Sequence, residues 1–202
     1  MGQSSKYALI VSYNGHKDSR IWASACARLL RDVLIDNGFR QKDIIFLNRV
    51  SREDVVDAVN LLKDKEGAGD TVVVAFFGHG GATGVCLYKS SISHAEIGNL
   101  LSELDSGKQL VIIDTCGSGG AIIGGYDGIT LNATNRIVLT STKAENESSV
   151  FTGHLTDWSR VVFEWGFKKG NADFNGDGFV SVQEAGSVKG GISDGYGEEF
   201  FL

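Results

Sequence analysis

The sequence predicts an α/β fold in which a mostly parallel central sheet lies between two layers of helices. Short, continuously apolar runs alternate along the chain with stretches whose apolar residues recur at helical spacing. Continuously apolar runs are typical of strands that are buried on both faces of a parallel sheet. Strand, helix and strand repeated in this order favour right-handed crossovers and a three-layer sandwich.

The expected elements follow one another in a regular order. The helix expected over 21–37 ends at Gly38, which suits a C-terminal cap, and the helix over 51–65 begins with Ser51 as its N-cap. An aromatic helix is expected over 156–168. The expected strands cover residues 7–13, 43–47, 71–77, 109–114 and 136–140.

Length and composition indicate one globular unit. The 202 residues are 42% hydrophobic and 22% charged, which suffices for one substantial core. We expect a main domain over 1–170 and a C-terminal segment over 171–202 that packs on it. The formal charge of −6 gives no reason to expect nucleic acid or an anionic membrane as a partner. No apolar run approaches the roughly 20 residues that span a bilayer.

The N-terminus and the cysteines bear on the compartment. The first residues lack the apolar stretch of a signal peptide. The protein is therefore expected in the cytoplasm if the chain is complete, and outside the cell or in a vesicle if a signal peptide was removed. Three cysteines are too few for a disulfide framework. Cys26, on a helix, and Cys86, in a short apolar segment, are expected in the core.

Two sequence motifs follow neighbouring strands of the predicted sheet. The third strand ends in Gly78-His79-Gly80-Gly81, and the fourth ends in Asp114-Thr115-Cys116 followed by glycines. Because ligands bind beyond the carboxyl ends of such strands, His79 and Cys116 are expected side by side at a binding edge. The backbone N–H groups of Gly80 and Cys116 are placed to face a developing oxyanion.

A thiol beside an imidazole is suited to nucleophilic catalysis. The imidazole of His79 raises the thiolate fraction of Cys116 and later protonates the leaving amine. Taken alone, such a cysteine is more often a small buried hydrophobe, and such a histidine a hydrogen-bonded loop residue. Both at adjacent strand ends, each followed by glycines, favour a catalytic dyad.

These motifs resemble the legumain family of cysteine peptidases, relatives of the caspases and metacaspases. The shared pattern is an apolar strand ending in His-Gly and another ending in acid-X-Cys. The stretch 140–149, which ends in Glu-Ser-Ser, and the Asp157-Trp158 pair are similar to legumain segments. The resemblance implies a caspase-like sandwich and an endopeptidase that cleaves after Asn, and after Asp at lower pH, through a thioester acyl-enzyme.

The resemblance also implies a substrate pocket. Arg20 would donate to the side-chain carbonyl of Asn, while Asp114 and Asp157 would accept from its amide nitrogen. Ser141, directly after the fifth strand, would line the same pocket. Two positions depart from the family pattern, since Asp18 stands where the family has an Asn that orients the histidine, and Asp114 replaces a Glu.

A calcium loop is expected near the C-terminus. Residues 173–184 match the twelve-residue EF-hand loop at every diagnostic position, with Gly178 at the sharp turn. The alternative is a surface turn rich in Asp, Asn and Gly that binds no ion. We expect a structural Ca²⁺ that fixes the C-terminal segment on the main domain. The expected ligands are Asp173, Asn175, Asp177, Phe179 through its carbonyl, Ser181 and Glu184.

Other functions remain open at this level. A transpeptidase or ligase would use the same Cys116 thioester and differ only in the acceptor. A metacaspase-like peptidase would cleave after Arg or Lys. Asp114 favours this alternative, whereas Arg20 and Asp157 oppose it. An inactive, calcium-stabilised binding module is the alternative from a different class. For the peptidase, the expected partners are peptides or proteins with Asn or Asp before the scissile bond.

Overall fold

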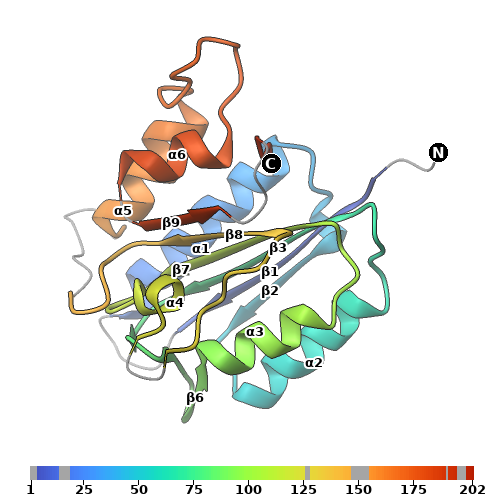
Figure 1. The fold of residues 1–202 in the computed structure, drawn as a ribbon, viewed down its shortest axis with the longest axis vertical. Coiled ribbons are helices and arrows are strands. Elements are labelled where there is room, and N and C mark those ends of the chain that lie inside the picture. The colour runs from blue at the N-terminus through green and yellow to red at the C-terminus, as the bar shows by residue number, and fades with distance from the viewer. Residues whose placement is uncertain (1–3, 14–18, 126–127, 147–154, 190, 195–198) are drawn as a thin grey trace.

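The computed structural model describes residues 4–13, 19–125, 128–146, 155–189, 191–194 and 199–202. In this part of the chain, the main sheet has six strands in the order β2-β1-β3-β7-β8-β9, and Figure 1 shows it between two layers of helices. All pairs are parallel except β8 with β9. The strands are β1 (Lys6–Ser12), β2 (Ile44–Asn48), β3 (Thr71–Phe77), β7 (Lys108–Asp114), β8 (Arg136–Thr140) and β9 (Gly191–Asp194).

Helices cover both faces of the sheet (Figure 1). One face carries α1 (Ser19–Asp36), α5 (Asp157–Ser159), the π-helical segment η2 (Arg160–Lys168) and α6 (Val182–Val188). The other carries α2 (Arg52–Lys63) and α3 (His94–Ser102). The short helices η1 (Gln41–Asp43) and α4 (Gly120–Ile123) complete the set. Of the described helices, none is both long enough and apolar enough to cross a bilayer.

The strands contribute side chains to two separate apolar cores, one on each face of the sheet. In β1, Ala8 and Ile10 pack towards α1, whereas Leu9 and Val11 pack towards α2 and α3. Successive side chains of a strand point to opposite faces, so a strand between two helical layers must be apolar throughout. This is the physical reason for the continuous apolar runs, and the predicted three-layer α/β sandwich is confirmed.

Some elements differ from the sequence prediction. The five predicted strands are present within about two residues of their predicted ends. Helix α3, the antiparallel edge strand β9 and a second, three-stranded sheet were not predicted. That sheet comprises β4 (Gly80–Gly81), β5 (Gly84–Leu87) and β6 (Ser90–Ser93). β4 and β6 are glycine- or serine-rich, and the apolar segment of β5 is too short to mark a strand as the longer runs do.

The C-terminal segment shares the core of the main sheet. Val182 and Ala185 of α6, together with Phe200 and Leu202, lie in the same buried cluster as α1. The Val182 amide donates to the Phe200 carbonyl over 2.8 Å. Ser181 is the N-cap of α6 and forms a capping box with Glu184. The predicted calcium loop therefore leads directly into a buried helix.

The loop after β7 packs directly on the β4–β5 hairpin at a glycine. A Cβ atom at Gly120 would lie 1.9 Å from the Ala82 carbonyl oxygen, far inside van der Waals contact. We expect Gly120→Ala to lower the free energy of unfolding by about 1–3 kcal/mol, because one backbone segment must move off the other. Urea unfolding of the purified variant measures this.

Gly67→Ala is the matched control for Gly120→Ala. A Cβ atom at Gly67 meets nothing within 4 Å. Its free energy of unfolding is expected to stay within about 0.5 kcal/mol of the parent protein. Equal losses in the two variants would contradict the packing argument.

Candidate active site

His79 and Cys116 follow paired residues of neighbouring strands. The β3–β7 register pairs Phe77 with Asp114, and the ladder continues through the Gly78 amide, which donates to the Asp114 carbonyl over 3.1 Å. His79 and Cys116 each lie two residues beyond this pair. In parallel strands, residues that lie the same number of positions beyond a paired residue lie at the same level along the strand direction. Neighbouring strands are about 4.8 Å apart. The structure therefore brings the two predicted catalytic residues to one edge of the sheet.

The turn that carries His79 requires a glycine. Gly78 has φ +148°, and a Cβ atom there would lie 2.3 Å from the Cβ atom of Tyr13. The Tyr13 amide donates to the Phe77 carbonyl over 2.8 Å, so the chain after β1 runs beside the chain after β3. Gly78 thus allows the close approach that places Tyr13 beside His79.

Two aromatic rings fix the orientation of the imidazole. The ring centres of Tyr13 and Trp22 lie 5.4 Å and 5.9 Å from that of His79, with interplanar angles of 79° and 88°. Both contacts are edge-to-face, the arrangement that the ring quadrupoles favour. Sequence reasoning missed both residues, although Tyr13 directly follows β1 and could have been placed at this edge.

Hydrogen bonds tie the loop after Cys116 to the loop after β8. The Ser118 hydroxyl accepts from the amides of Ser141 and Thr142, each over 3.1 Å. The Gly117 amide donates to the Asn146 carbonyl over 2.8 Å. The loop after Cys116 is thereby anchored, while Cys116 itself stays partly exposed.

Asp114 is a buried acceptor in this structure. Its side chain is 0% exposed, and Oδ2 accepts from the hydroxyls of Thr156 (2.5 Å) and Ser159 (2.7 Å). Thr156 also caps α5, where its hydroxyl accepts from the Ser159 amide. Because the Asp114 side chain is fully buried, the predicted contact with a substrate amide would require the residues that cover it to move. In the structure, these hydrogen bonds of Asp114 join the start of α5 to the end of β7.

Cys26 lies beside this buried cluster and is in the core, as predicted. It is 0% exposed, and its sulfur accepts from the Thr156 amide over 3.3 Å. Burial, and then the charge of Asp114, raise the pKa of the Cys26 thiol to about 11. The prediction for Cys86 was wrong, because this thiol is exposed on β5. Its neighbours Val85 and Leu87 point inwards, so Cys86 takes the outward position of the alternating strand.

Asp157 forms an ion pair with Lys189, a residue that the sequence analysis did not identify. Its carboxylate pairs with the Lys189 ammonium, and the Trp158 indole N–H donates to the Lys189 carbonyl over 2.6 Å. Asp157 remains partly exposed, with 26% of its side chain accessible. Lys189 follows α6 and approaches α5 only through the tertiary fold, and no local sequence signal marks it.

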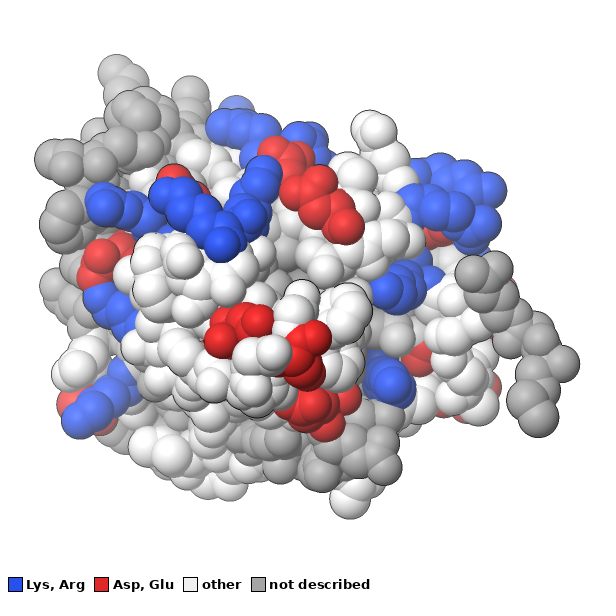
Figure 2. Space-filling view, turned by 90° about the horizontal axis from the view of Figure 1, so that it is seen from above, with Lys and Arg blue, Asp and Glu red and all other residues white. Residues whose placement is uncertain are grey.

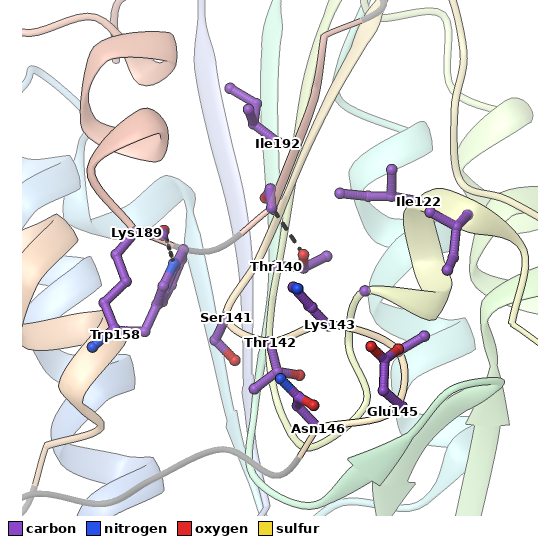
Figure 3. A pocket seen from close by; sticks show the side chains of 14 residues that line it. Ile122, Thr140, Ser141, Thr142, Lys143, Glu145, Asn146, Trp158, Lys189 and Ile192 are labelled. Atoms are coloured by element: carbon purple, nitrogen blue, oxygen red, sulfur yellow. Dashed lines mark hydrogen bonds between the residues drawn. The ribbon is translucent and has the colours of Figure 1, made fainter.

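A cavity of about 580 Å³ lies beyond the carboxyl end of β8. Figure 3 shows Ser141 on its wall, with Trp158 and Lys189 on one side and Ile122 on the other. Neither His79 nor Cys116 lines this cavity. The cavity lies at the strand next to β7, and Ser141 is the one of the four residues predicted to bind the substrate that lines it.

The remaining pocket prediction concerns Arg20 at the start of α1. Arg20 is the second residue of this helix, but its side chain lies outside the described part of the structure, and so does Asp18. Trp22, two residues further on, contacts the His79 ring. The first turn of α1 therefore lies at the same edge as the dyad.

Two glycines and a set of hydrogen bonds to Asp173 turn the backbone of the loop over 173–184. Gly176 and Gly178 have φ +75° and +90°, and Asp173 accepts from both of their amides, over 2.8 Å and 3.0 Å. Hydrogen bonds from the amide and hydroxyl of Ser181 and other loop amides lower the pKa of Glu184.

The donor chemistry of this loop suits Ca²⁺, but the side chains are not gathered around one point. Asp, Asn, Ser and Glu oxygens are the ligands that Ca²⁺ prefers. Among the described residues, no group of three or more His, Cys, Asp or Glu side chains is placed to hold a metal ion. Asp173 and Glu184 bind loop amides instead. Calcium binding remains a prediction.

On the face drawn in Figure 2, positive and negative side chains are mixed. Figure 2 shows Lys and Arg interspersed with Asp and Glu on that face, with several acidic groups near its middle. A groove of one sign that would steer a polyanion is not seen on this face.

Comparison with known proteins agrees with this geometry. The sequence matches the family model described as "Caspase domain" over residues 5–177. Among solved structures, caspase-1 from Spodoptera frugiperda is similar with a TM-score of 0.66 and 14% sequence identity, over 98% of this chain and 89% of that one. A search of curated proteins finds no match. With its His79 and Cys116 at adjacent strand ends, the chain belongs to the caspase-domain family and is a caspase-like cysteine peptidase.

Proposed function

We propose that this protein is an endopeptidase that cleaves after Asn, and after Asp at lower pH, with Cys116 as nucleophile and His79 as general acid and base. The observation that carries the dyad is the β3–β7 register, which sets both residues two positions beyond the Phe77–Asp114 pair. The aromatic contacts of Tyr13 and Trp22 support the role of His79, because an oriented imidazole transfers protons along a fixed line.

The reaction runs through a thioester. The Cys116 thiolate attacks the carbonyl carbon before the scissile bond, and the carbonyl oxygen becomes an oxyanion. The intermediate collapses as the C–N bond breaks, and His79 gives its proton to the leaving amine. His79 then takes a proton from water, which attacks the thioester carbonyl and releases the acid and the Cys116 thiolate.

The strand pairing around Gly80 supports its role in binding the oxyanion. The Cys86 amide donates to the His79 carbonyl over 2.9 Å, so these two residues form the hydrogen-bonded pair of the β4–β5 ladder. Gly80 and Val85 are the next pair. In an antiparallel ladder, the next pair does not bond across the strands, so the Gly80 N–H points away from β5. It is then available to donate towards the substrate.

The charges around the pocket favour a neutral amide over a cation before the scissile bond. Asp114 is occupied by two hydroxyls, and Asp157 is paired with Lys189. The Lys189 ammonium offsets the charge of Asp157, and the Asp114 carboxylate is fully buried, so the attraction of either carboxylate for an Arg or Lys side chain is weakened. Arg20, in the first turn of α1, would donate to the amide oxygen of Asn. An Asp side chain would be accepted better once a carboxyl of the pocket or substrate is protonated, which requires lower pH.

Replacing the nucleophile tests the dyad. Cys116→Ala is expected to lower kcat about a thousandfold or more against fluorogenic peptides with Asn before the scissile bond, because no thioester forms. Peptides with Asp, Arg, Lys or Ala at that position, assayed at pH 5 and pH 7, complete the panel. Product masses with and without an added amine distinguish hydrolysis from ligation.

Cys86→Ala is the matched control, since it removes the other exposed thiol, and it is expected to keep the parent rate. Cleavage after Arg or Lys would be consistent with the catalytic roles of Cys116 and His79 but would contradict the proposed specificity for Asn. No cleavage of any peptide, together with a Cys116 thiol no more reactive towards iodoacetamide than free cysteine, would indicate a binding module.

Arg20→Ala tests the specificity pocket. We expect kcat/KM for the Asn peptide to fall about 10- to 100-fold, since a hydrogen bond from a charged donor contributes about 1.5–3 kcal/mol. The control is Arg28→Ala, which removes an exposed arginine two turns further along α1. If both variants cleave the Asn peptide as the parent does, Arg20 does not bind the substrate.

We further propose that the loop over 173–184 binds a structural Ca²⁺, which would neutralise its acidic side chains and hold the start of α6. Removal of calcium with EDTA is expected to lower the melting temperature by several degrees. Asp177→Asn should abolish this difference, because it removes one anionic ligand while keeping an oxygen that can accept from the Phe179 amide.

Asp57→Asn, at an exposed acid of α2, is the control for the calcium experiment and should leave the difference intact. A melting temperature that neither calcium nor EDTA changes would show that the loop is a surface turn without an ion.

A further inference from the structure

The exposed thiol of Cys86 lies next to the dyad. It occupies the outward position on β5, directly opposite His79 in the β4–β5 ladder, and its amide donates to the His79 carbonyl over 2.9 Å. Residues directly opposite in an antiparallel pair project to the same face of the ribbon. Cys86 therefore projects to the face on which His79 works, and both residues line one small recess together with Thr115.

The β4–β5 hairpin, of which Cys86 is part, is packed through β4 and its turn against the segment that carries Cys116. A Cβ atom at Gly80 would lie 2.5 Å from the Thr115 hydroxyl oxygen, and one at Gly117 would lie 2.7 Å from the Ala82 nitrogen. Residues on both sides of Cys116 thus contact the β4–β5 hairpin. Burial, and then the proximity of Cys116, raise the pKa of the Cys86 thiol.

We propose that Cys86 is a resolving thiol, which forms a reversible disulfide with Cys116 after a peroxide has oxidised Cys116. The inference rests on the proposed function in one respect, that Cys116 is the reactive nucleophile. Both cysteines are present as thiols in the structure. The hairpin and the loop after β7 are in contact, and the disulfide requires a movement of either that brings the two Cα atoms to a separation of about 4.4–6.8 Å.

The chemistry balances with hydrogen peroxide as the oxidant. The Cys116 thiolate attacks one peroxide oxygen, the O–O bond breaks, and the departing hydroxide takes up a proton to give water. Sulfur is oxidised to the sulfenic acid while the peroxide is reduced. The Cys86 thiolate then attacks the Cys116 sulfur, the S–S bond forms, and the S–O bond breaks to release a second water. A small dithiol reverses the step by thiol–disulfide exchange.

The disulfide would switch the peptidase off and protect it. The nucleophilic sulfur would be bonded to Cys86 and could not attack a carbonyl. A sulfenic acid without a resolving thiol is oxidised further to sulfinic acid, which thiols do not reduce. Cys26 cannot act as the resolving thiol, because it is 0% exposed and its sulfur accepts a hydrogen bond from the Thr156 amide. Its thiol, with a pKa of about 11, serves as the inert internal reference.

The test uses the whole chain, with equimolar to tenfold hydrogen peroxide followed by iodoacetamide. Trypsin places Cys26, Cys86 and Cys116 in separate peptides, over residues 21–28, 66–89 and 109–136. In the parent protein we expect a disulfide between the second and third peptides, an unmodified first peptide, and loss of activity that dithiothreitol restores to at least about 80%. In Cys86→Ser, activity before peroxide should be unchanged, and the loss after peroxide should not be recovered.

Each result decides the inference. Equal, irreversible oxidation of Cys116 in the parent and in Cys86→Ser would overturn it, and so would a disulfide found only between molecules. Cys86→Ala repeats the experiment in case the serine variant fails to fold. The mass readout needs no peptidase activity. An intramolecular disulfide in a protein that cleaves no peptide would therefore uphold this inference and overturn only the proposed cleavage after Asn or Asp.

Discussion

The parallel pairing of β1, β3 and β7 is the constraint on which the rest of the site depends. Their carboxyl ends are aligned residue for residue, with Ser12 beside Phe77 and Phe77 beside Asp114. The ladder extends beyond the strands through the amides of Tyr13 and Gly78. A slip of one residue in either register would reverse every side chain of that strand between the two cores. The apolar cores on both faces therefore fix the heights at which His79 and Cys116 leave the sheet.

Above this edge, the site is assembled by contacts between backbones. Gly117 and Gly120 let the nucleophile loop lie against the hairpin at Ala82, where any side chain would force the two apart. Ser118 joins the same loop to the chain after β8. The thiol is thus held between the hairpin that carries His79 and the loop that carries Ser141. This accounts for the concentration of glycines around residues whose positions must be precise.

A buried polar cluster connects the strand ends with the helical layer. Asp114 would be costly in the core without donors, and Thr156 and Ser159 supply them from the start of α5. The same helix start carries Asp157, whose pairing with Lys189 brings in the segment after α6. The pocket side of the molecule is therefore coupled to the C-terminal segment. A calcium ion that orders the loop before α6 would act on the pocket through this route.

The sequence by itself determined the five parallel strands of the main sheet, its position between two helical layers, and the placement of His79 and Cys116 at neighbouring strand ends. These follow from short-range patterns: continuous apolar runs, helical spacing, and glycine-rich turns at the strand ends. It also determined that Cys26 is buried, from the helical neighbours of that residue. Only the tertiary structure decided that Tyr13 and Trp22 contact the imidazole of His79, that Lys189 pairs with Asp157, and that Cys86 lies opposite His79. Those contacts join residues distant in the chain, and β5 is too short for its alternation to separate an outward thiol from a buried one.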